Sequence, residues 1–258
     1  QRTVMAIKLV ISGCCGRMGR SIALLAANDA AFTLTGALET SGHASLGRDL
    51  GMAIGHPADL GVRVVSDARV AMSGGDVVVE FTTPEVTVAH AQLARDLRKP
   101  MVIGTTGLSD AQLQTLRLAA QAVPIVLSPN MSPGVNVLFE LAQAAAQRLG
   151  EYDVEVVESH HKQKKDAPSG TAKRLAEVLA AARKQLPGAI PVHAVRAGDI
   201  VGDHTVIFAG PSERLELTHR AHTREVFAQG ALRAARFVVE QKPGLYDMSD
   251  VLKRAHSA

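Results

Sequence analysis

The chain has 258 residues, a mass of 27.2 kDa and a formal net charge of +3. Hydrophobic residues make up 47% and charged residues 21%, which excludes a disordered chain, and two cysteines exclude a disulfide-stapled scaffold. The length suits one or two domains. Aromatic residues are 3% of the chain, with no Trp, which disfavours a surface that stacks nucleic-acid bases. We therefore expect no nucleic-acid partner.

No run of about eighteen apolar residues occurs, and no charged-then-apolar leader is visible near the first methionine, Met5. Cys14 and Cys15 are adjacent, and adjacent side chains would close only a strained ring, so we expect reduced thiols. These features predict a cytoplasmic protein with no membrane partner. We expect the fold to begin after residues 1–4.

The first half of the chain alternates short apolar runs with Ala- and Leu-rich stretches of helical spacing. Continuous Val and Ile runs are typical of parallel strands that are buried on both faces. The class is therefore α/β, with an N-terminal Rossmann-type parallel sheet domain. The predicted strands are Ala6–Ser12, Phe32–Leu38, Asp76–Phe81, Met101–Ile103 and Pro124–Leu127, and the predicted helices are Ser21–Ala27, Ser66–Ser73, Glu85–Leu97 and Ser109–Ala122.

The pattern changes after a helix predicted at Asn136–Leu149. Tyr152–Ser159 alternates polar and apolar residues, which indicates a strand with one solvated face. Two prolines and a glycine in Ser128–Gly134 mark a domain boundary and a candidate hinge. We predict a C-terminal α+β domain with a mixed or antiparallel sheet, containing a helix at Ser169–Lys184, strands at Val192–Ile200, His204–Ala209 and Arg214–His219, a helix at Arg224–Glu240 and a closing segment at Gly244–Leu252.

Gly13, Gly16 and Gly19 lie between the first predicted strand and the first predicted helix. Glycines there permit a tight turn and let backbone N–H groups approach a pyrophosphate at the helix N-terminus. Glu39 closes the second strand, where a carboxylate accepts hydrogen bonds from an adenosine ribose. The glycine spacing differs from the usual fingerprint, and the alternative is an ordinary helix start beside an unrelated surface glutamate. The α/β setting favours dinucleotide binding.

The choice of dinucleotide depends on the residues after Glu39. Thr40 follows it, and no Arg or Lys occurs before Arg48, so a partner for the 2′-phosphate of NADPH is missing. Arg17, inside the glycine loop, and Arg20, just beyond it, remain candidates for a phosphate contact. We expect NADH to be accepted at least as well as NADPH.

The segment His160–Thr171 concentrates histidines and lysines between a strand and a helix. Ser169 or Thr171 is placed to cap that helix, and its unpaired N–H groups with nearby lysines suit a carboxylate. Imidazole and ammonium groups also transfer protons near neutral pH. The alternative is a solvated basic loop. A third metal ligand at convincing spacing is missing, so we expect no metal.

Six motifs occur in one order and together resemble the 4-hydroxy-tetrahydrodipicolinate reductase family, also called dihydrodipicolinate reductase, of bacterial diaminopimelate and lysine synthesis. The most specific is His160–Thr171, and the resemblance covers essentially Ala6–Leu252. The motifs are the glycine loop Gly13–Gly19, Glu39, Gly104–Gly107, Asn130–Asn136, His160–Thr171 and Arg196–Thr205.

The resemblance implies NADH- or NADPH-dependent reduction of a small cyclic dicarboxylate, 4-hydroxy-tetrahydrodipicolinate, to tetrahydrodipicolinate. It implies a homotetramer with a dinucleotide-binding domain at 1–130, to which 241–258 return, and a substrate-binding and oligomerisation domain at 131–240. His160 and Lys164 match the family's catalytic pair, with Lys164 as our choice of proton donor. Substrate positions are His161, Ser169, Gly170 and Thr171, and cofactor positions are Gly13, Gly16, Arg17, Met18, Glu39, Phe81, Gly104, Thr105, Thr106, Ser128, Pro129, Asn130 and Met131.

Cys14 and Cys15 depart from the family pattern, because small non-thiol residues are expected there, and thiols beside a pyrophosphate make binding sensitive to oxidation. Thr40 and Thr83 stand where some members carry an arginine. Three other readings compete: a different two-domain dehydrogenase, a dinucleotide sensor, and an inactive reductase homologue. The His160–Thr171 segment disfavours the first, the missing DNA-binding module the second, and the intact His160 and Lys164 the third.

Overall fold

The structure, a computed structural model, describes residues 5–253 and divides into two compact units. The first contains the described residues up to Met131 and those from Phe227 onward, and the second is Ser132–Val226. The predicted return to the first unit lies at residue 241, whereas the structure has it at Phe227. The reason is helix α8 (Glu225–Val238), whose apolar residues from Ala228 to Val238 are buried in the core of the first unit.

The first unit is built on a seven-stranded sheet in the order β11-β6-β5-β4-β1-β2-β3, in which every recorded strand pair is parallel. This confirms the predicted Rossmann-type sheet. Its strands are β1 (Ile7–Ser12), β2 (Phe32–Leu38), β3 (Val64–Val65), β4 (Val77–Glu80), β5 (Met101–Ile103), β6 (Pro124–Leu127) and β11 (Gly244–Tyr246).

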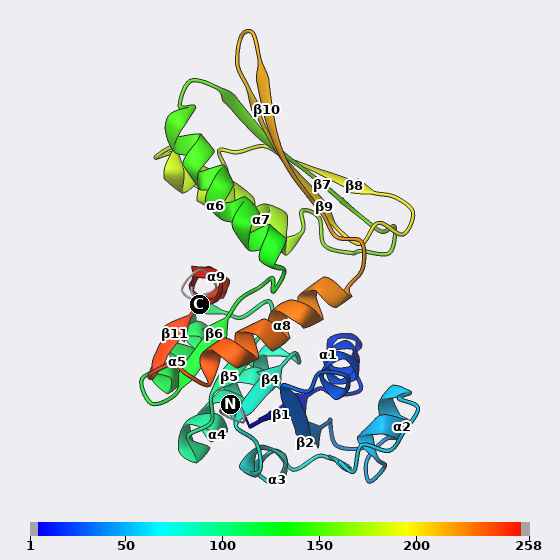
Figure 1. Ribbon diagram of the computed structural model, residues 1–258. Helices are drawn as coiled ribbons and strands as arrows, with labels where there is room; N and C mark the ends of the chain where they lie inside the picture. The colour runs from blue at the N-terminus through cyan, green and yellow to red at the C-terminus, as the bar shows by residue number, and fades with distance from the viewer. Residues whose placement is uncertain (1–4, 254–258) are drawn as a thin grey trace. The chain divides into compact units, whose positions relative to one another are not determined.

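Helices cover both faces of this sheet, as Figure 1 shows. Successive residues of a strand point to opposite faces, so Leu9 and Ile11 enter one core and Val10 enters the other. The first core includes residues of α1 (Arg17–Ala27), α2 (Leu50–Ile54), α8 and α9 (Met248–Lys253), and the second includes residues of α3 (Ala68–Ser73), α4 (Pro84–Leu97) and α5 (Asp110–Ala120).

Four short elements were not predicted as separate elements: α2, β3, and the pair β11 and α9, which were predicted as one closing segment. They span too few residues for a periodic pattern. Each depends on tertiary contacts instead. The side chain of Asp49 caps α2 and also accepts hydrogen bonds from Leu60 and Val62, while β3 pairs with the end of β2.

The second unit holds a four-stranded mixed sheet in the order β10-β9-β7-β8, which confirms the predicted sheet type. Two helices pack on one face of it (Figure 1). Strand β8 ends at Arg196 rather than the predicted Ile200, because the chain turns at Gly198, where φ is +49°. The elements are α6 (Pro133–Arg148), β7 (Asp153–His160), α7 (Gly170–Ala182), β8 (Val192–Arg196), β9 (Asp203–Ala209) and β10 (Arg214–Arg220).

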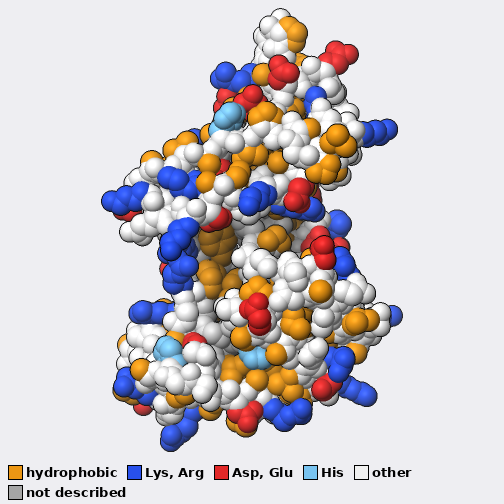
Figure 2. All heavy atoms as spheres, turned by 180° about the vertical axis from the view of Figure 1, so that it is seen from behind, with side chains coloured by type: hydrophobic (Ala, Val, Ile, Leu, Met, Phe, Trp, Pro, Cys, Tyr) orange, Lys and Arg blue, Asp and Glu red, His pale blue; other side chains and the backbone are white. Residues whose placement is uncertain are grey.

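The surface carries both signs of charge. On the face drawn in Figure 2, Lys and Arg side chains are interspersed with Asp and Glu side chains, in keeping with a net charge of only +3. In the part of the chain that the structure describes, no helix combines the length and the apolar character that crossing a membrane requires.

Candidate active site

The glycine loop joins β1 to α1 and is shaped by backbone contacts. Gly13 has a φ of +70°, a conformation that side-chain-bearing residues rarely adopt. A Cβ on Gly19 would lie 2.1 Å from the carbonyl oxygen of Gly13, so only glycine permits the helix to pack this closely. The backbone N–H groups of Gly13 and Cys14 donate to Leu38 at the end of β2, over 2.9 and 3.1 Å. The loop is therefore fixed to the carboxyl edge of the sheet.

Helix α1 begins at Arg17, after Gly16, which has no side chain to cap the helix. Arg17 is exposed and Met18 packs against the first core. The carboxylate of Glu39 accepts a hydrogen bond from the Cys15 N–H at 3.0 Å and another from the Thr40 N–H at 2.9 Å. The structure therefore brings this glutamate to the glycine loop. The backbone-lined loop and oriented carboxylate fit a dinucleotide.

The two adjacent thiols lie in this loop and are free. Cys14 is fully buried in the first core, and burial raises the pKa of its thiol. Cys15 is half-buried. Their sulfur atoms lie 3.8 Å apart, and a carboxylate oxygen of Glu39 lies within 4.8 Å of both.

The other predicted cofactor residues follow β4, β5 and β6 at the same edge of the sheet. A Cβ on Gly104 would lie 2.0 Å from the ring of Phe81. The Phe81 ring can occupy this position because residue 104 has no side chain. Thr105 is buried, and its hydroxyl pairs with that of Thr87 at 2.7 Å and accepts from the N–H of Thr82 at 3.2 Å. Thr106 follows directly in the chain.

Sequence reasoning missed the group that anchors this region. Glu80 is fully buried at the end of β4, where its carboxylate contacts the His90 Nδ1 at 2.7 Å and accepts from the Thr82 hydroxyl. The buried carboxyl group thereby has hydrogen-bond partners, as burial of a polar group requires. A lone acid at the end of a valine run is the signal that predicts such a position.

The segment after β6 supplies the last predicted cofactor residues. The Ser128 N–H donates to Ile103 at 3.1 Å, and its hydroxyl donates to the Asn130 carbonyl at 2.8 Å. Pro129 lies between them in the chain. Met131 is buried, and a Cβ on Gly230 would lie 1.8 Å from its carbonyl oxygen. The structure therefore fixes this segment tightly within the first unit.

In the second unit, successive side chains of β7 point alternately inward and outward, and two of the inward ones are polar. Val154 and Val156 face the core, and two and four residues further on Glu158 and His160 point to the same side. The register sets Glu158 opposite His204 on β9. It also sets His160 beside Arg196 on β8. A buried ionic cluster therefore forms where the apolar core ends.

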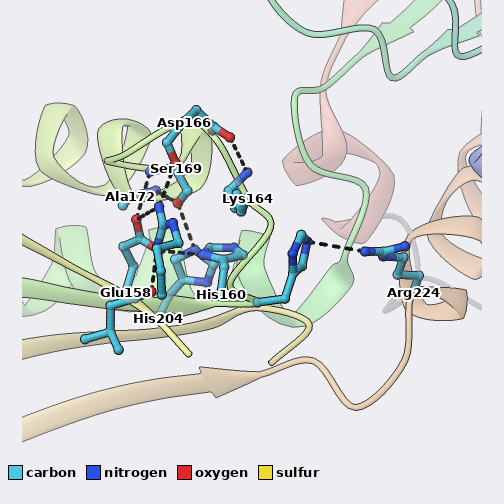
Figure 3. Close-up of polar contacts among 11 residues, drawn as sticks. Glu158, His160, Lys164, Asp166, Ser169, Ala172, His204 and Arg224 are labelled. Atoms are coloured by element: carbon cyan, nitrogen blue, oxygen red, sulfur yellow. Dashed lines mark hydrogen bonds and ion pairs between the residues drawn. The ribbon is translucent and has the colours of Figure 1, made fainter. Parts of the chain in front are cut away.

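Glu158 is the centre of this cluster (Figure 3). Arg196 donates to both of its carboxylate oxygens, at 2.7 and 2.9 Å, and the Ser169 N–H donates to it at 3.0 Å. The Nδ1 of His160 also bonds to the carboxylate, which sets the orientation of the imidazole ring. The ring of His204 packs edge-on against that of His160, with centroids 5.2 Å apart. Every charge in the cluster has a partner, which is what makes its burial tolerable.

The environment decides the charge of each group. Burial alone would raise the pKa of Glu158, but hydrogen bonds from Arg196 and His160 bring it below its ordinary value. Burial lowers the pKa of His160, assisted by the positive charges of Lys164 and Arg196 and opposed by Glu158. Burial also lowers the pKa of His204 to about 3. Near neutral pH the cluster therefore holds a carboxylate, a guanidinium and two uncharged imidazoles.

Lys164 and His161 lie at the accessible side of the cluster. The ammonium of Lys164 pairs with Asp166 at 2.8 Å, and its side chain is 23% exposed, compared with 10% for that of His160. His161 contacts Arg224 through its Nε2 at 3.3 Å. Its Nδ1 is buried without a hydrogen-bond partner among the residues that the structure describes.

The N-terminus of α7 completes the site. The hydroxyl of Ser169 caps the helix by accepting from the Ala172 N–H at 3.2 Å, and it contacts the Nε2 of His204 at 3.3 Å. A Cβ built on Gly170 would have no atom within 4 Å, so the first turn faces open space there. Thr171 is the next residue of the helix. The structure thus brings together His160, Lys164 and the helix start that the sequence predicted.

Sequence reasoning missed Glu158, and gave Arg196 and His204 no role beyond a motif and a strand. The signal was present, because Glu158 occupies an inward position in the alternating pattern of β7, where an unpaired acid would be costly.

The fold and the site define the class: a two-domain oxidoreductase that uses a nicotinamide cofactor. Residues 7–131 match the family described as "Dihydrodipicolinate reductase, N-terminus", and residues 134–252 match "Dihydrodipicolinate reductase, C-terminus". The chain belongs to the dihydrodipicolinate reductase family.

Relatives named 4-hydroxy-tetrahydrodipicolinate reductase support this membership. The one from Syntrophus aciditrophicus (strain SB) is 46% identical over 95% of this chain and 98% of its own. The one from Anaeromyxobacter sp. (strain Fw109-5) is 48% identical over 95% and 97%. Among solved structures, the dipicolinate-bound dihydrodipicolinate reductase from Paenisporosarcina sp. TG-14 is similar, with a TM-score of 0.79, 29% identity and coverage of 94% of this chain and 98% of that one.

Proposed function

We propose that this protein reduces 4-hydroxy-tetrahydrodipicolinate to tetrahydrodipicolinate, a step of diaminopimelate and lysine synthesis. The observation that carries the proposal is the buried Glu158–His160–Arg196 cluster, which holds an imidazole beside a lysine and an open helix N-terminus. Family membership supplies the substrate, and the chain contains every residue that the resemblance marks for catalysis.

The first unit is proposed to bind the nucleotide. Gly13 and Gly16 would let the pyrophosphate approach the start of α1, where the backbone N–H groups of the first turn, with Arg17 and Met18, would hold it. Glu39 would accept hydrogen bonds from the adenosine ribose. Residues that follow β4, β5 and β6 would surround the nicotinamide, which supplies a hydride when it is bound reduced. These residues are Phe81, Gly104, Thr105, Thr106, Ser128, Pro129, Asn130 and Met131.

We propose that NADH is used at least as well as NADPH. Glu39 is followed by Thr40, and the next Arg or Lys in the chain is Arg48. A carboxylate at the ribose favours a free 2′-hydroxyl, whereas a 2′-phosphate needs a basic partner. The two backbone hydrogen bonds to Glu39 hold its carboxylate in place without neutralising its charge.

The second unit is proposed to bind the dicarboxylate. Ser169, Gly170 and Thr171 begin α7, where N–H groups and the helix dipole favour an anion, and His161 supplies a further polar contact. Lys164 is our proton donor, because its ammonium group is more accessible than the buried ring of His160, whose pKa is lowered by burial. As electron density builds on the substrate ring, Lys164 Nζ would release a proton to it and His160 would orient the reacting groups.

We further propose a homotetramer that works in the cytoplasm, where its free thiols stay reduced. Strands β8 and β10 expose Val195 and Leu215, which suits an interface built on the sheet of the second unit. Light scattering should give about four times the chain mass of 27.2 kDa. A mass equal to that of one chain would contradict this assembly.

The direct test is oxidation of NADH, and of NADPH in parallel, with substrate made in the same tube by the preceding synthase from pyruvate and aspartate semialdehyde. We expect oxidation only when the synthase is present, at a rate with NADH no lower than with NADPH. Folded protein that binds nucleotide but oxidises neither would contradict the function, and would favour the sensor or the inactive homologue.

A further inference from the structure

Cys14, Cys15 and Glu39 form the one group of three or more metal-ligand side chains whose donor atoms lie together within residues 5–253. The three atoms lie within 4.8 Å of one another, and the two sulfurs are 3.8 Å apart. Two thiolates bound tetrahedrally to zinc, each at about 2.3 Å, also stand about 3.8 Å apart. The sulfurs therefore already have the separation that such an ion requires.

Two strand ends hold these ligands in place. Cys14 is held by the hydrogen bond from its N–H to Leu38, and its side chain is enclosed in the first core. Cys15 is tied to the third ligand directly, because its N–H donates to the Glu39 carboxylate at 3.0 Å. Cys15 and Glu39 are only half-buried, so solvent can supply a fourth ligand. A cation would enter a preformed group of two sulfurs and one oxygen.

We propose that this thiol–carboxylate group binds a thiophilic divalent cation such as zinc or cadmium, and that the bound cation excludes the dinucleotide. Binding is ligand exchange: each thiol passes its proton to solvent as a metal–sulfur bond forms, and no electrons are transferred. Soft sulfur ligands select such metals over magnesium or calcium. The exclusion rests on the proposed function, because Glu39 is the same carboxylate that we assign to the ribose.

The test is a titration of the reduced, nucleotide-free protein with cadmium chloride, followed by the ultraviolet charge-transfer band of the cadmium–thiolate bond. We expect one ion per chain. The chain has two cysteines, so Cys15→Ser leaves one thiol and should lose at least about half of the band and bind cadmium roughly a hundredfold more weakly. Cys15→Ala provides a second variant with the same expectation, and thermal melting shows whether each is folded.

His43→Asn is the matched control. His43 follows the end of β2 and is a metal-binding residue type outside the group, and Asn keeps an acceptor for the Ser45 N–H. It should leave the cadmium band unchanged. A band that is absent in the wild type, or that survives intact in both Cys15 variants, would overturn the metal site.

Exclusion is measured by NADH fluorescence with and without one equivalent of cadmium. We expect NADH to bind at least tenfold more weakly with cadmium present, and recovery after a chelator is added. Equal NADH affinity with and without the ion would overturn the exclusion. None of these measurements uses the substrate, so their failure is distinguishable from failure of the reductase assay.

Discussion

The glycine loop of the first unit and the ionic cluster of the second are held together by different interactions. The loop depends on backbone atoms and on missing side chains, since a Cβ on Gly19 would lie 2.1 Å from a carbonyl oxygen. The cluster depends on charged side chains, since Glu158 accepts hydrogen bonds from Arg196, His160 and Ser169. The first therefore tolerates changes of chemistry, such as two cysteines, but not of volume. The second should tolerate changes of volume better than changes of charge.

Replacing the ammonium should give the largest effect. Lys164→Ala is expected to lower turnover by about 10²–10⁴-fold, the usual contribution of a positioned proton donor. Lys165→Ala is the control, because Lys165 is exposed in the same segment, and it should change turnover by less than about threefold. Steady-state rates with saturating NADH check both. Equal rates for Lys164→Ala and the wild type would remove Lys164 from catalysis.

Removing the buried charge of Glu158 should have the next largest effect, on stability. Glu158→Gln keeps the size of the side chain but leaves Arg196 without its charged partner, so the free energy of unfolding should fall by about 3–5 kcal/mol. Glu155→Gln is matched on the same strand, where Glu155 pairs with His193 on the surface, and should cost less than about 1 kcal/mol. Denaturant titrations compare the two. Equal losses would show that the cluster is not a buried ionic network.

A methyl group in the loop should give a smaller loss of stability. In Gly19→Ala the new Cβ clashes with backbone, so we expect a loss of about 1–3 kcal/mol together with weaker nucleotide binding. Gly74→Ala is the control, because its Cβ would meet no atom within 4 Å, and it should change stability by no more than about 0.5 kcal/mol. If Gly19→Ala unfolds and binds NADH like the wild type, the loop is not limited by volume.

Acid should weaken the second unit through its buried imidazoles. The pKa of His204 is about 3 in the folded protein and 6.5 ordinarily, so the unfolded chain takes up a proton first as the pH falls below 6.5. Stability is therefore greatest above pH 6.5, and the unfolding constant should rise up to about tenfold per pH unit between pH 6.5 and 3. His160 and His219, whose pKa values are also lowered, add in the same direction.

His204→Asn isolates this contribution. Denaturant midpoints at pH 7 and pH 5.5 should fall less in the variant than in the wild type, because one of the groups that takes up a proton on unfolding is gone. The same fall in both proteins would show that His204 does not titrate differently on folding.

The sequence predicted most of the architecture because both kinds of strand have visible patterns. Runs such as Val77–Val79 indicate a sheet covered on both faces, and the alternation of β7 indicates a sheet with one solvated face. Strand β3 could not be predicted, since its two residues are strand only through pairing with β2. The sequence pattern of α8 predicts an apolar face, but it does not indicate which of the two units buries that face. The assignment of α8 to the first unit therefore could not be predicted.

Part of the site could also be predicted, because some of its residues form local sequence patterns. Glycines, Glu39 and the His160–Thr171 segment are contiguous or regularly spaced in the sequence. The partners that set their charge are not: Arg196 reaches Glu158 from 38 residues away, across a strand pairing. The bonding of His160 to Glu158, and the burial that lowers the pKa of its ring, both follow from packing alone.

The division of labour between the two regions is tested most directly by the affinity for NADH in Lys164→Ala and Glu39→Ala, measured by nucleotide fluorescence. The cluster is assigned to the substrate and the glycine loop to the nucleotide. NADH should therefore bind Lys164→Ala within a few-fold of the wild type and bind Glu39→Ala at least about tenfold more weakly. A large loss of NADH affinity in Lys164→Ala, or an unchanged affinity in Glu39→Ala, would contradict the account.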